Sequence, residues 1–375
     1  MLSFQLNSGL LNKIRYLQKL FIEKYHTLCA LSADEQEMLH RLARISVVGA
    51  STRIENAVLT DLEIDWLDTL LIKDSKTTAF QKHKAMISDK LSKERERSIE
   101  EVIGCRTMLM IIYEQAQSLV PLTETSIRGL HHELLRHYPK ATRYVGRYKT
   151  NSNSVVSFNK ITQSKKTVLE TAAPGIQTQT QMFELIKWYN QAYENEPFTL
   201  PLACEFVFRF LAIHPFQDGN GRLGRGLFLL LLLQSQDISL AYVSRFLAID
   251  RHIEQHKEEY YWVLHRCSNG KFSVNPKKYH VENFFNFMIK VLIESLNDIE
   301  INHKKYHVLR SLSTSAQAVL QCFKEKPESR LQTNQICSLI KIPRRTVINS
   351  LNTLLKHGLI QRYGQGAGSR YQLIF

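Results

Sequence analysis

Residues 214–225 read His-Pro-Phe-Gln-Asp-Gly-Asn-Gly-Arg-Leu-Gly-Arg and lie between an apolar segment and the start of a helical pattern. The ordinary pKa of histidine is about 6.5, so His214 can accept a proton from an attacking hydroxyl near neutral pH. Asp218 offers the hard oxygen ligand that Mg²⁺ prefers. The turn at 219–221 lacks bulky side chains, so its backbone N–H groups can close around phosphate oxygens at the N-terminus of the next helix. The stretch therefore predicts phosphoryl or nucleotidyl transfer.

Two arginines extend this candidate phosphate site. Arg222 and Arg225 lie three residues apart on the predicted helix, where both guanidinium groups can bind further phosphates. Taken singly, a histidine beside a proline or an Asp-Gly turn is more often structural than catalytic. The joint spacing within one short stretch favours the functional interpretation.

The same stretch resembles the signature of the Fic family, H-x-F-x-(D/E)-G-N-G-R-x-x-R, at every fixed position. The resemblance implies an α-helical fold that transfers AMP from ATP to a Ser, Thr or Tyr hydroxyl of a protein, with pyrophosphate leaving. It implies that His214 is the general base, Phe216 anchors the loop and Asp218 binds Mg²⁺. The implied phosphate-binding residues are Gly219, Asn220, Gly221, Arg222 and Arg225. Kinase-like relatives alter the second half of the motif, which is intact here and favours nucleotidyl transfer.

Further segments are similar to other parts of this family. Gly146-Arg147-Tyr148 is similar to the family's G-x-(Y/W)-R region, although the arginine is displaced. A polar segment separates Val155–Phe158 from Thr167–Leu169, which predicts a β-hairpin resembling the family's flap. An exposed strand edge of such a hairpin can hold a target segment. Tyr260 and Tyr261 are either residues of the adenine pocket or aromatic residues of a helix core.

An earlier segment, residues 51–56, resembles the family's inhibitory signature, (S/T)-x-x-x-E-(G/N). The matching residues are Ser51, Glu55 and Asn56. Ser51 and Glu55 lie four apart and share one face of a helix. The resemblance implies that Glu55 pairs with Arg225 and fills the space of the γ-phosphate. The alternative interpretation is a solvated glutamate beside a helix cap.

The net charge of +14 is unevenly distributed over the 375 residues. Beyond residue 302 there are twelve Lys and Arg against two Glu, so most of the basic excess lies in the last fifth of the chain. Such an asymmetry is typical of an appended nucleic-acid-binding module.

The patterns in this basic region predict three helices, at 316–323, 333–340 and 344–356, followed by a hairpin. This is the element order of a winged helix, whose third helix would be the recognition helix. The candidate DNA-binding residues are Arg344, Arg345, Arg362 and Arg370. A winged helix can instead mediate protein contacts, including a homodimer.

The chain as a whole is predicted to be mainly α: a Fic helical core with a small β-hairpin flap, followed by a C-terminal winged-helix domain. We place an N-terminal helical region carrying the inhibitory motif at 1–100, the Fic catalytic domain and following helices at 101–300, a linker near 301–312 and the winged-helix domain at 310–375. The six cysteines form no C-x-x-C pair, and the longest apolar run is far shorter than a membrane span. We expect a cytoplasmic protein with no membrane partner.

The leading hypothesis is a self-inhibited protein adenylyltransferase that uses ATP and Mg²⁺, modifies a protein target or itself, and binds duplex DNA through its C-terminal domain. One alternative is a DNA-binding regulator whose Fic body senses nucleotide without turnover, although the retained His214, Asp218 and arginines argue against it. Another is a hydrolase that removes AMP from a modified protein, in which Glu55 positions water.

Overall fold

The computed structural model describes residues 2–55, 57, 59–72, 96–159, 164–196, 198–324 and 329–373. They form two compact units. Unit 1 comprises Met1–Val58 and Ser88–Ile299, and unit 2 comprises Leu59–Ile87 and Glu300–Phe375. Helices dominate both units and the strands form small antiparallel sheets, so the prediction of a mainly α fold is confirmed.

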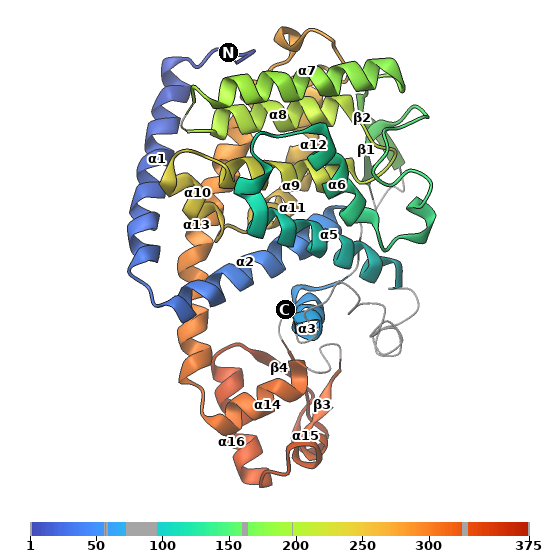
Figure 1. Ribbon diagram of the computed structural model, residues 1–375. Coiled ribbons are helices and arrows are strands. Elements are labelled where there is room, and N and C mark those ends of the chain that lie inside the picture. Colours follow the sequence, from blue (N-terminus) through green and yellow to red (C-terminus); the bar gives the residue numbers. More distant parts are fainter. Residues whose placement is uncertain are drawn as a thin grey trace. The chain divides into compact units, whose positions relative to one another are not determined.

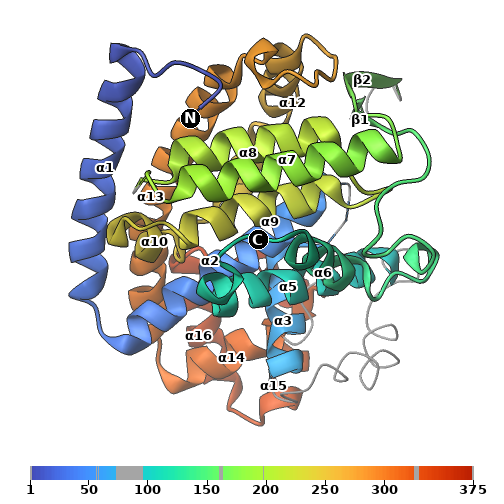
Figure 2. The ribbon, with the colours of Figure 1, turned by 45° about the horizontal axis from the view of Figure 1, so that its top comes forward.

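Unit 1 contains most of the helices and one hairpin (Figures 1 and 2). Its elements are α1 (Ser8–Cys29), α2 (Ala33–Ile54), α5 (Glu96–Gln115), η2 (Ala116–Leu119), α6 (Glu124–Leu135), η3 (Pro139–Ala141), β1 (Ser154–Asn159), β2 (Ser164–Glu170), α7 (Ile176–Tyr193), α8 (Leu200–Ile213), α9 (Asn220–Leu233), α10 (Ile238–Ser244), α11 (Ile249–Gln255), α12 (Lys257–Ser268), η4 (Pro276–Lys278) and the first part of α13 (Val281–Ser311).

Helices α8 and α9 form the centre of unit 1. Nearly every side chain of both helices is buried, and a helix that is apolar on all sides is stable only inside a protein. α7 runs beside α8 in both views (Figures 1 and 2), and α9 packs against α8. The loop that joins α8 to α9 is therefore held at both ends by buried helices.

Helix α2 brings a distant part of the chain to this centre. It begins at a capping box between Ser32 and Glu35, and its second half is buried and rich in small residues. This half packs against α5 and α11, and it also contacts α9. The helix ends at Ile54, so Glu55 is its C-terminal cap residue.

The predicted β-hairpin is confirmed. β1 and β2 pair antiparallel from Ser154–Glu170 to Asn159–Ser164, with a register irregularity between Val155 and Val156. Its base is joined to the helical core, because the Glu170 N–H donates to the Gly270 carbonyl.

Unit 2 contains α3 (Asp61–Ile72), the end of α13, α14 (Thr314–Lys324), β3 (Leu331–Gln332), α15 (Thr333–Ile340), α16 (Arg344–Lys356), β4 (Ile360–Tyr363), η5 (Gly366–Gly368) and β5 (Arg370–Leu373). The sheet order is β3-β5-β4, and both pairings are antiparallel. One apolar core joins α14, α15 and α16 to this sheet. The three predicted helices are therefore present, in the predicted order, and are followed by a hairpin.

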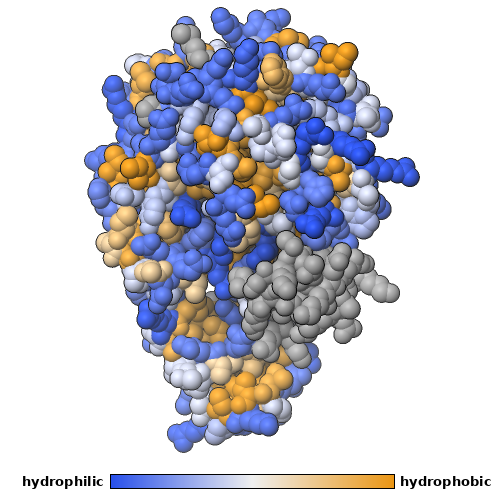
Figure 3. Space-filling model, in the orientation of Figure 1, coloured by the Kyte–Doolittle hydropathy of each residue, from blue (hydrophilic) through white to orange (hydrophobic). Residues whose placement is uncertain are grey.

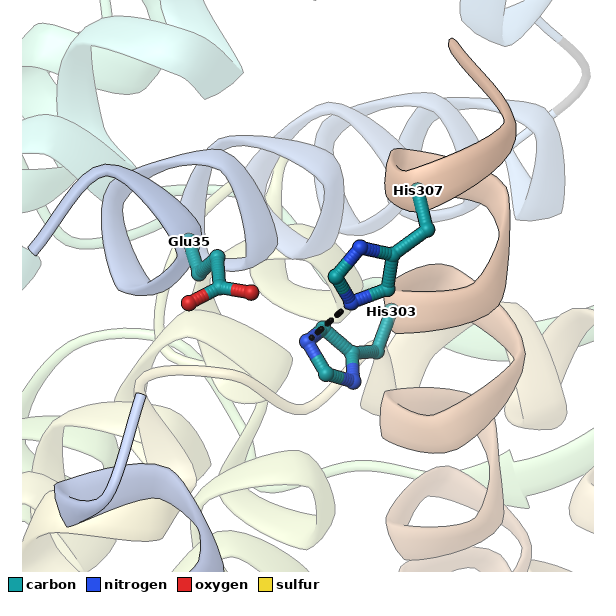
Figure 4. Close-up of side chains that lie close together, drawn as sticks. All are labelled: Glu35, His303 and His307. Carbon is teal, nitrogen blue, oxygen red and sulfur yellow. Dashed lines mark hydrogen bonds between the residues drawn. The ribbon is translucent and has the colours of Figure 1, made fainter. Parts of the chain in front are cut away.

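The linker that the sequence predicts near 301–312 is helical instead. α13 continues through this region to Ser311, and its sequence contains neither glycine nor proline to interrupt the helix. His303 and His307 lie one turn apart on this part of α13, with their Nε2 atoms 3.0 Å apart (Figure 4).

On the face shown in Figure 3, the surface of unit 1 is largely hydrophilic, with hydrophobic residues in small separate patches. Within the described parts of the chain, no helix combines the length and the apolar character that a membrane span requires.

Candidate active site

The candidate site is built on the loop between α8 and α9, residues 214–219, which we call the motif loop. Both ends of the loop adopt the left-handed region: His214 at φ 53°, and Gly219, the N-cap of α9, at φ 80°. Such a φ is uncommon for a residue with a side chain and is found mostly where the surrounding structure imposes it. His214 is therefore held in a defined orientation at the end of α8.

Asn220 closes the motif loop. Its Oδ1 accepts from the Phe216 N–H at 2.9 Å, and its Nδ2 donates to the Phe216 carbonyl at 2.7 Å. Phe216 is fully buried beneath the loop. The resemblance implies that Asn220 binds phosphate, but its side chain instead fixes the loop. Only the backbone N–H of Asn220 is left to bind an anion.

His131 of α6 supports the loop from below. Its ring stacks on Phe216, with centroids 3.8 Å apart and planes 9° apart. The Gly146 N–H donates to Nδ1, so Nε2 carries the proton and donates to the Asp218 carbonyl at 2.9 Å. Burial lowers the pKa of His131 to about 4, which keeps the ring neutral and this hydrogen-bond pattern intact.

His214 is arranged as a base. Its Nδ1 lies 3.2 Å from the Leu211 carbonyl, which can only accept, so Nδ1 is the donor and Nε2 keeps a lone pair for a proton. Burial and then the positive charge of Lys149 lower the pKa of His214 to about 4, while Glu55 and Asp218 oppose this shift. The neutral, proton-accepting form therefore prevails at neutral pH.

Lys149 joins the hairpin to the motif loop. Its buried Nζ donates to Asn153 Oδ1, to Thr171 Oγ1 and to the Ile213 carbonyl, at 2.8, 3.0 and 3.0 Å. The backbone follows the same path, because the Lys149 N–H donates to the Pro215 carbonyl. Asn153 and Thr171 flank the two strands of the hairpin, so one ammonium group ties the hairpin base to the residue before His214.

Asp218 has the properties of a Mg²⁺ ligand. Its side chain is 41% exposed, and Oδ1 lies 3.7 Å from Arg222 Nη2. A single carboxylate beside candidate phosphate-binding groups suits Mg²⁺, which usually keeps several waters and binds through one or two carboxylates and substrate phosphates.

Arg222 also carries hydrogen-bond donors without partners. It is buried, yet its Nε and Nη1 make no hydrogen bond within the described structure. Buried donors without partners are rare in native proteins, so Arg222 is a candidate for binding a further group.

A carboxylate at the end of α2 lies beside the candidate phosphate-binding residues Gly221, Arg222 and Arg225, which we call the anion cradle or simply the cradle. Glu55 Oε1 accepts from Arg225 Nη2 at 3.1 Å. A side chain at Gly221 would place its Cβ only 2.4 Å from Glu55 Oε1 and 3.3 Å from Arg225 Nη1, so the carboxylate rests against the first turn of α9. Burial alone would raise the pKa of Glu55, but Arg225 and Arg222 lower it below its ordinary value. Glu55 is therefore ionised at neutral pH.

The two tyrosines of α12 lie next to this ion pair. Tyr260 is buried, and its ring packs near Tyr261, Phe284 and Phe287. Burial raises the pKa of Tyr260 to about 12, and the nearby charge of Arg225 opposes this shift. Tyr260 thus belongs to the aromatic core and also borders the candidate site, so the two interpretations from the sequence are compatible.

Residues 121–232, from before α6 to α9, match the sequence model of the Fic/DOC family. The chain carries a Fic domain. Proteins with a Fic domain are generally transferases, and they commonly attach AMP to other proteins.

Solved structures agree with this fold. A Fic family protein from Desulfovibrio desulfuricans superimposes with a TM-score of 0.55 and 22% identity, over 100% of this chain and 98% of that chain. A Fic domain-containing signaling protein from Bacteroides thetaiotaomicron gives 0.55 and 22%, over 77% and 97%. Fic-1 from C. elegans gives 0.53 and 16%, over 80% and 76%. At such identities the likeness shows the fold.

The structure brings together most residues that the sequence singled out around the Fic motif. Ser51 and Glu55 meet Arg225 there, whereas Asn56 lies outside the described residues. The candidate DNA-binding residues Arg344, Arg345, Arg362 and Arg370 all belong to unit 2.

Sequence reasoning missed three residues of the site: His131, Lys149 and Asp250. A signal existed only for Lys149, which directly follows the segment where the family's arginine is displaced. His131 and Asp250 belong to no motif, and only packing brings them to the site.

The geometry predicts that His214 titrates near pH 4 rather than near 6.5, because burial and Lys149 disfavour its charged form. NMR titration of the imidazole, assigned by comparison with His214→Ala, measures this pKa. Lys149→Met should raise it, because a nearby positive charge is removed. A ring that titrates near 6.5 in the unmodified protein would contradict the buried environment described here.

Proposed function

We propose that this protein is an adenylyltransferase that transfers AMP from ATP to a hydroxyl of a protein, and that Glu55 holds it in an inhibited state. The observation that carries the proposal is the position of the Glu55 carboxylate. It binds Arg225 and rests against Gly221, within the anion cradle of the Fic motif. An anion held by the chain itself stands where the nucleotide phosphates would bind.

The site residues fit the chemistry. His214 Nε2 takes the proton of the target hydroxyl as the oxygen bonds to the α-phosphorus of ATP, and the bond to pyrophosphate breaks. Backbone N–H groups at the start of α9, together with Arg222 and Arg225, hold the phosphates. Mg²⁺, held by Asp218 and the phosphates, would neutralise the charge of the leaving pyrophosphate. The hairpin offers a strand edge to which a target segment can pair.

Glu55→Gly should raise AMP transfer by about tenfold or more, because it frees Arg225 to bind the terminal phosphates of ATP. Each 1.4 kcal/mol by which Glu55 opposes phosphate binding corresponds to a tenfold change. Transfer from labelled ATP to the protein itself and to lysate proteins measures the effect.

Two variants control this experiment. Glu37→Gly places the same substitution at an exposed position of α2 and should leave transfer unchanged. Glu55→Gly combined with Arg225→Ala should be inactive. If Glu55→Gly transfers no more AMP than the unmodified protein but loses the ability to remove AMP from a modified target, the hydrolase hypothesis replaces this one.

His214→Ala in the Glu55→Gly protein should lower transfer by roughly 10²–10⁴-fold, the usual contribution of a general base. Nucleotide binding should be retained, because the phosphate cradle is untouched. Calorimetric titration with ATP and a transfer assay on the same sample separate the two effects. Transfer at the level of the parent protein would remove His214 from the mechanism.

We further propose that residues 310–375, within unit 2, form a winged-helix domain that binds duplex DNA. The supporting observation is the outer face of α16, which exposes Arg344, Arg345, Asn349 and Asn352 while Val347, Leu351 and Leu354 face the core. Basic and amide groups on one exposed helix face suit phosphates and base edges.

The full-length protein should bind duplex DNA with an affinity that falls steeply with salt, and Arg344→Ala with Arg345→Ala should reduce the slope of log K against log salt by about two. Fluorescence anisotropy at several salt concentrations measures this. Lys304→Ala with Lys305→Ala removes the same charge from an exposed part of α13 and should leave the slope nearly unchanged. Equal effects of the two pairs would indicate nonspecific attraction to a basic protein, and no binding at low salt would assign unit 2 to protein contacts.

A further inference from the structure

The buried guanidinium of Arg225 has acidic partners on two sides. From α2, Glu55 Oε1 binds Nη2, and the Ser51 carbonyl accepts from the same nitrogen at 2.8 Å. From α11, Asp250 Oδ2 lies 3.3 Å from Nε. Arg225 is 3% exposed and Asp250 is 6% exposed, whereas Glu55 is 34% exposed. Asp250 is thus the more deeply buried of the two carboxylates.

Ser51 contacts the same nitrogen of Arg225 as Asp250 does. Its hydroxyl accepts from Arg225 Nε at 3.1 Å, and Asp250 Oδ2 lies 3.3 Å from that nitrogen. The inner edge of the guanidinium, at Nε, is therefore bound by α11 and Ser51. Its outer nitrogens, Nη1 and Nη2, face Gly221 and Glu55.

Asp250 has its own attachment to the core. Two residues further along α11, His252 bonds Asp298 of α13 through Nε2 at 2.9 Å and lies 3.3 Å from Glu294 through Nδ1. These contacts do not involve the segment that carries Glu55. α11 also packs against α2, where Arg53 pairs with Glu254, so the contacts with α13 hold α11 in addition to those with the helix that precedes Glu55.

A displaced Glu55 would leave Arg225 as a buried cation. Breaking a buried ion pair by removal of one partner is strongly destabilising, because the remaining charge is uncompensated. With Asp250 in place the charge stays compensated at Nε, and only the outer nitrogens change their partner from carboxylate to phosphate.

We propose that Asp250 is a positioning residue that anchors Arg225 at Nε, so that the outer nitrogens of the guanidinium face the cradle both when Glu55 fills it and when nucleotide does. The proposal rests on the proposed function, because it assigns the cradle to the terminal phosphates of ATP. Asp250 touches no phosphate itself and acts through Arg225.

The test compares nucleotide affinities in the Glu55→Gly background of the full-length protein. Asp250→Asn keeps the size of the side chain but removes its charge. It should weaken ATP binding by about tenfold or more, since a buried charge pair is broken, and change AMP binding by no more than about twofold, since AMP lacks the terminal phosphates. Calorimetric titrations measure both affinities. Asp250→Glu, which keeps the charge, should restore most of the ATP affinity.

Unchanged or tighter ATP binding in the Asp250→Asn variant would overturn the proposal, because the acid would then only repel phosphate. Equal losses of ATP and AMP affinity would also overturn it and indicate general damage to the site. Because these are binding measurements, a protein that binds ATP as expected but transfers no AMP would contradict the proposed function and leave the role of Asp250 supported.

A second measurement keeps Asp250 intact. The Nε–H resonance of Arg225 should stay protected from solvent exchange in the Glu55→Gly protein, with and without ATP, because its partners are Asp250 and Ser51. Loss of that protection when Glu55 is removed would show that Glu55, and not Asp250, holds the guanidinium, and would overturn the proposal.

Discussion

The site depends on one buried charge, the guanidinium of Arg225. Arg225 is 3% exposed on a helix whose other buried side chains are almost all apolar. A cation in such a place is tolerated only with counter-charge and hydrogen-bond acceptors around it. The chain supplies these from α2, which packs against α9, and from Asp250 of α11, so both helices must approach Arg225. The neutralisation of one side chain thus fixes the contacts of three helices.

The conformation of the motif loop is fixed by side chains from several elements. A loop of six residues is braced by Asn220 from within, by His131 from below and by Lys149 from the hairpin side. Each brace satisfies backbone groups of the loop that would otherwise need water. The conformation of the loop therefore comes from the buried helices at its ends and from the side chains of Asn220, His131 and Lys149.

Lys149 contacts both the hairpin and the residue before His214. Lys149 binds the two ends of the hairpin and the carbonyl before His214 with the same ammonium group, and its charge also lowers the pKa of His214. A substitution at Lys149 would therefore act on the hairpin and on His214 together. Lys149 occupies the position of the arginine in the family's G-x-(Y/W)-R region, and its buried Nζ donates to three acceptors there.

The sequence by itself identified the motif at residues 214–225 and the helices α14, α15 and α16. Both are local: consecutive residues on a tight turn stay together whatever packs around them, and an apolar period specifies a helix without reference to the rest of the chain. Tertiary structure decided which distant groups reach the motif. Glu55 contacts Arg225 across 170 positions of sequence, and the sequence suggested that contact only through resemblance. Asp250 and His131 carried no signal, because their roles arise where α11 and α6 pack. The partner of a buried charge or of an unpaired backbone group is whichever group tertiary packing places beside it. The spacing of residues along a short stretch of sequence does not give this information.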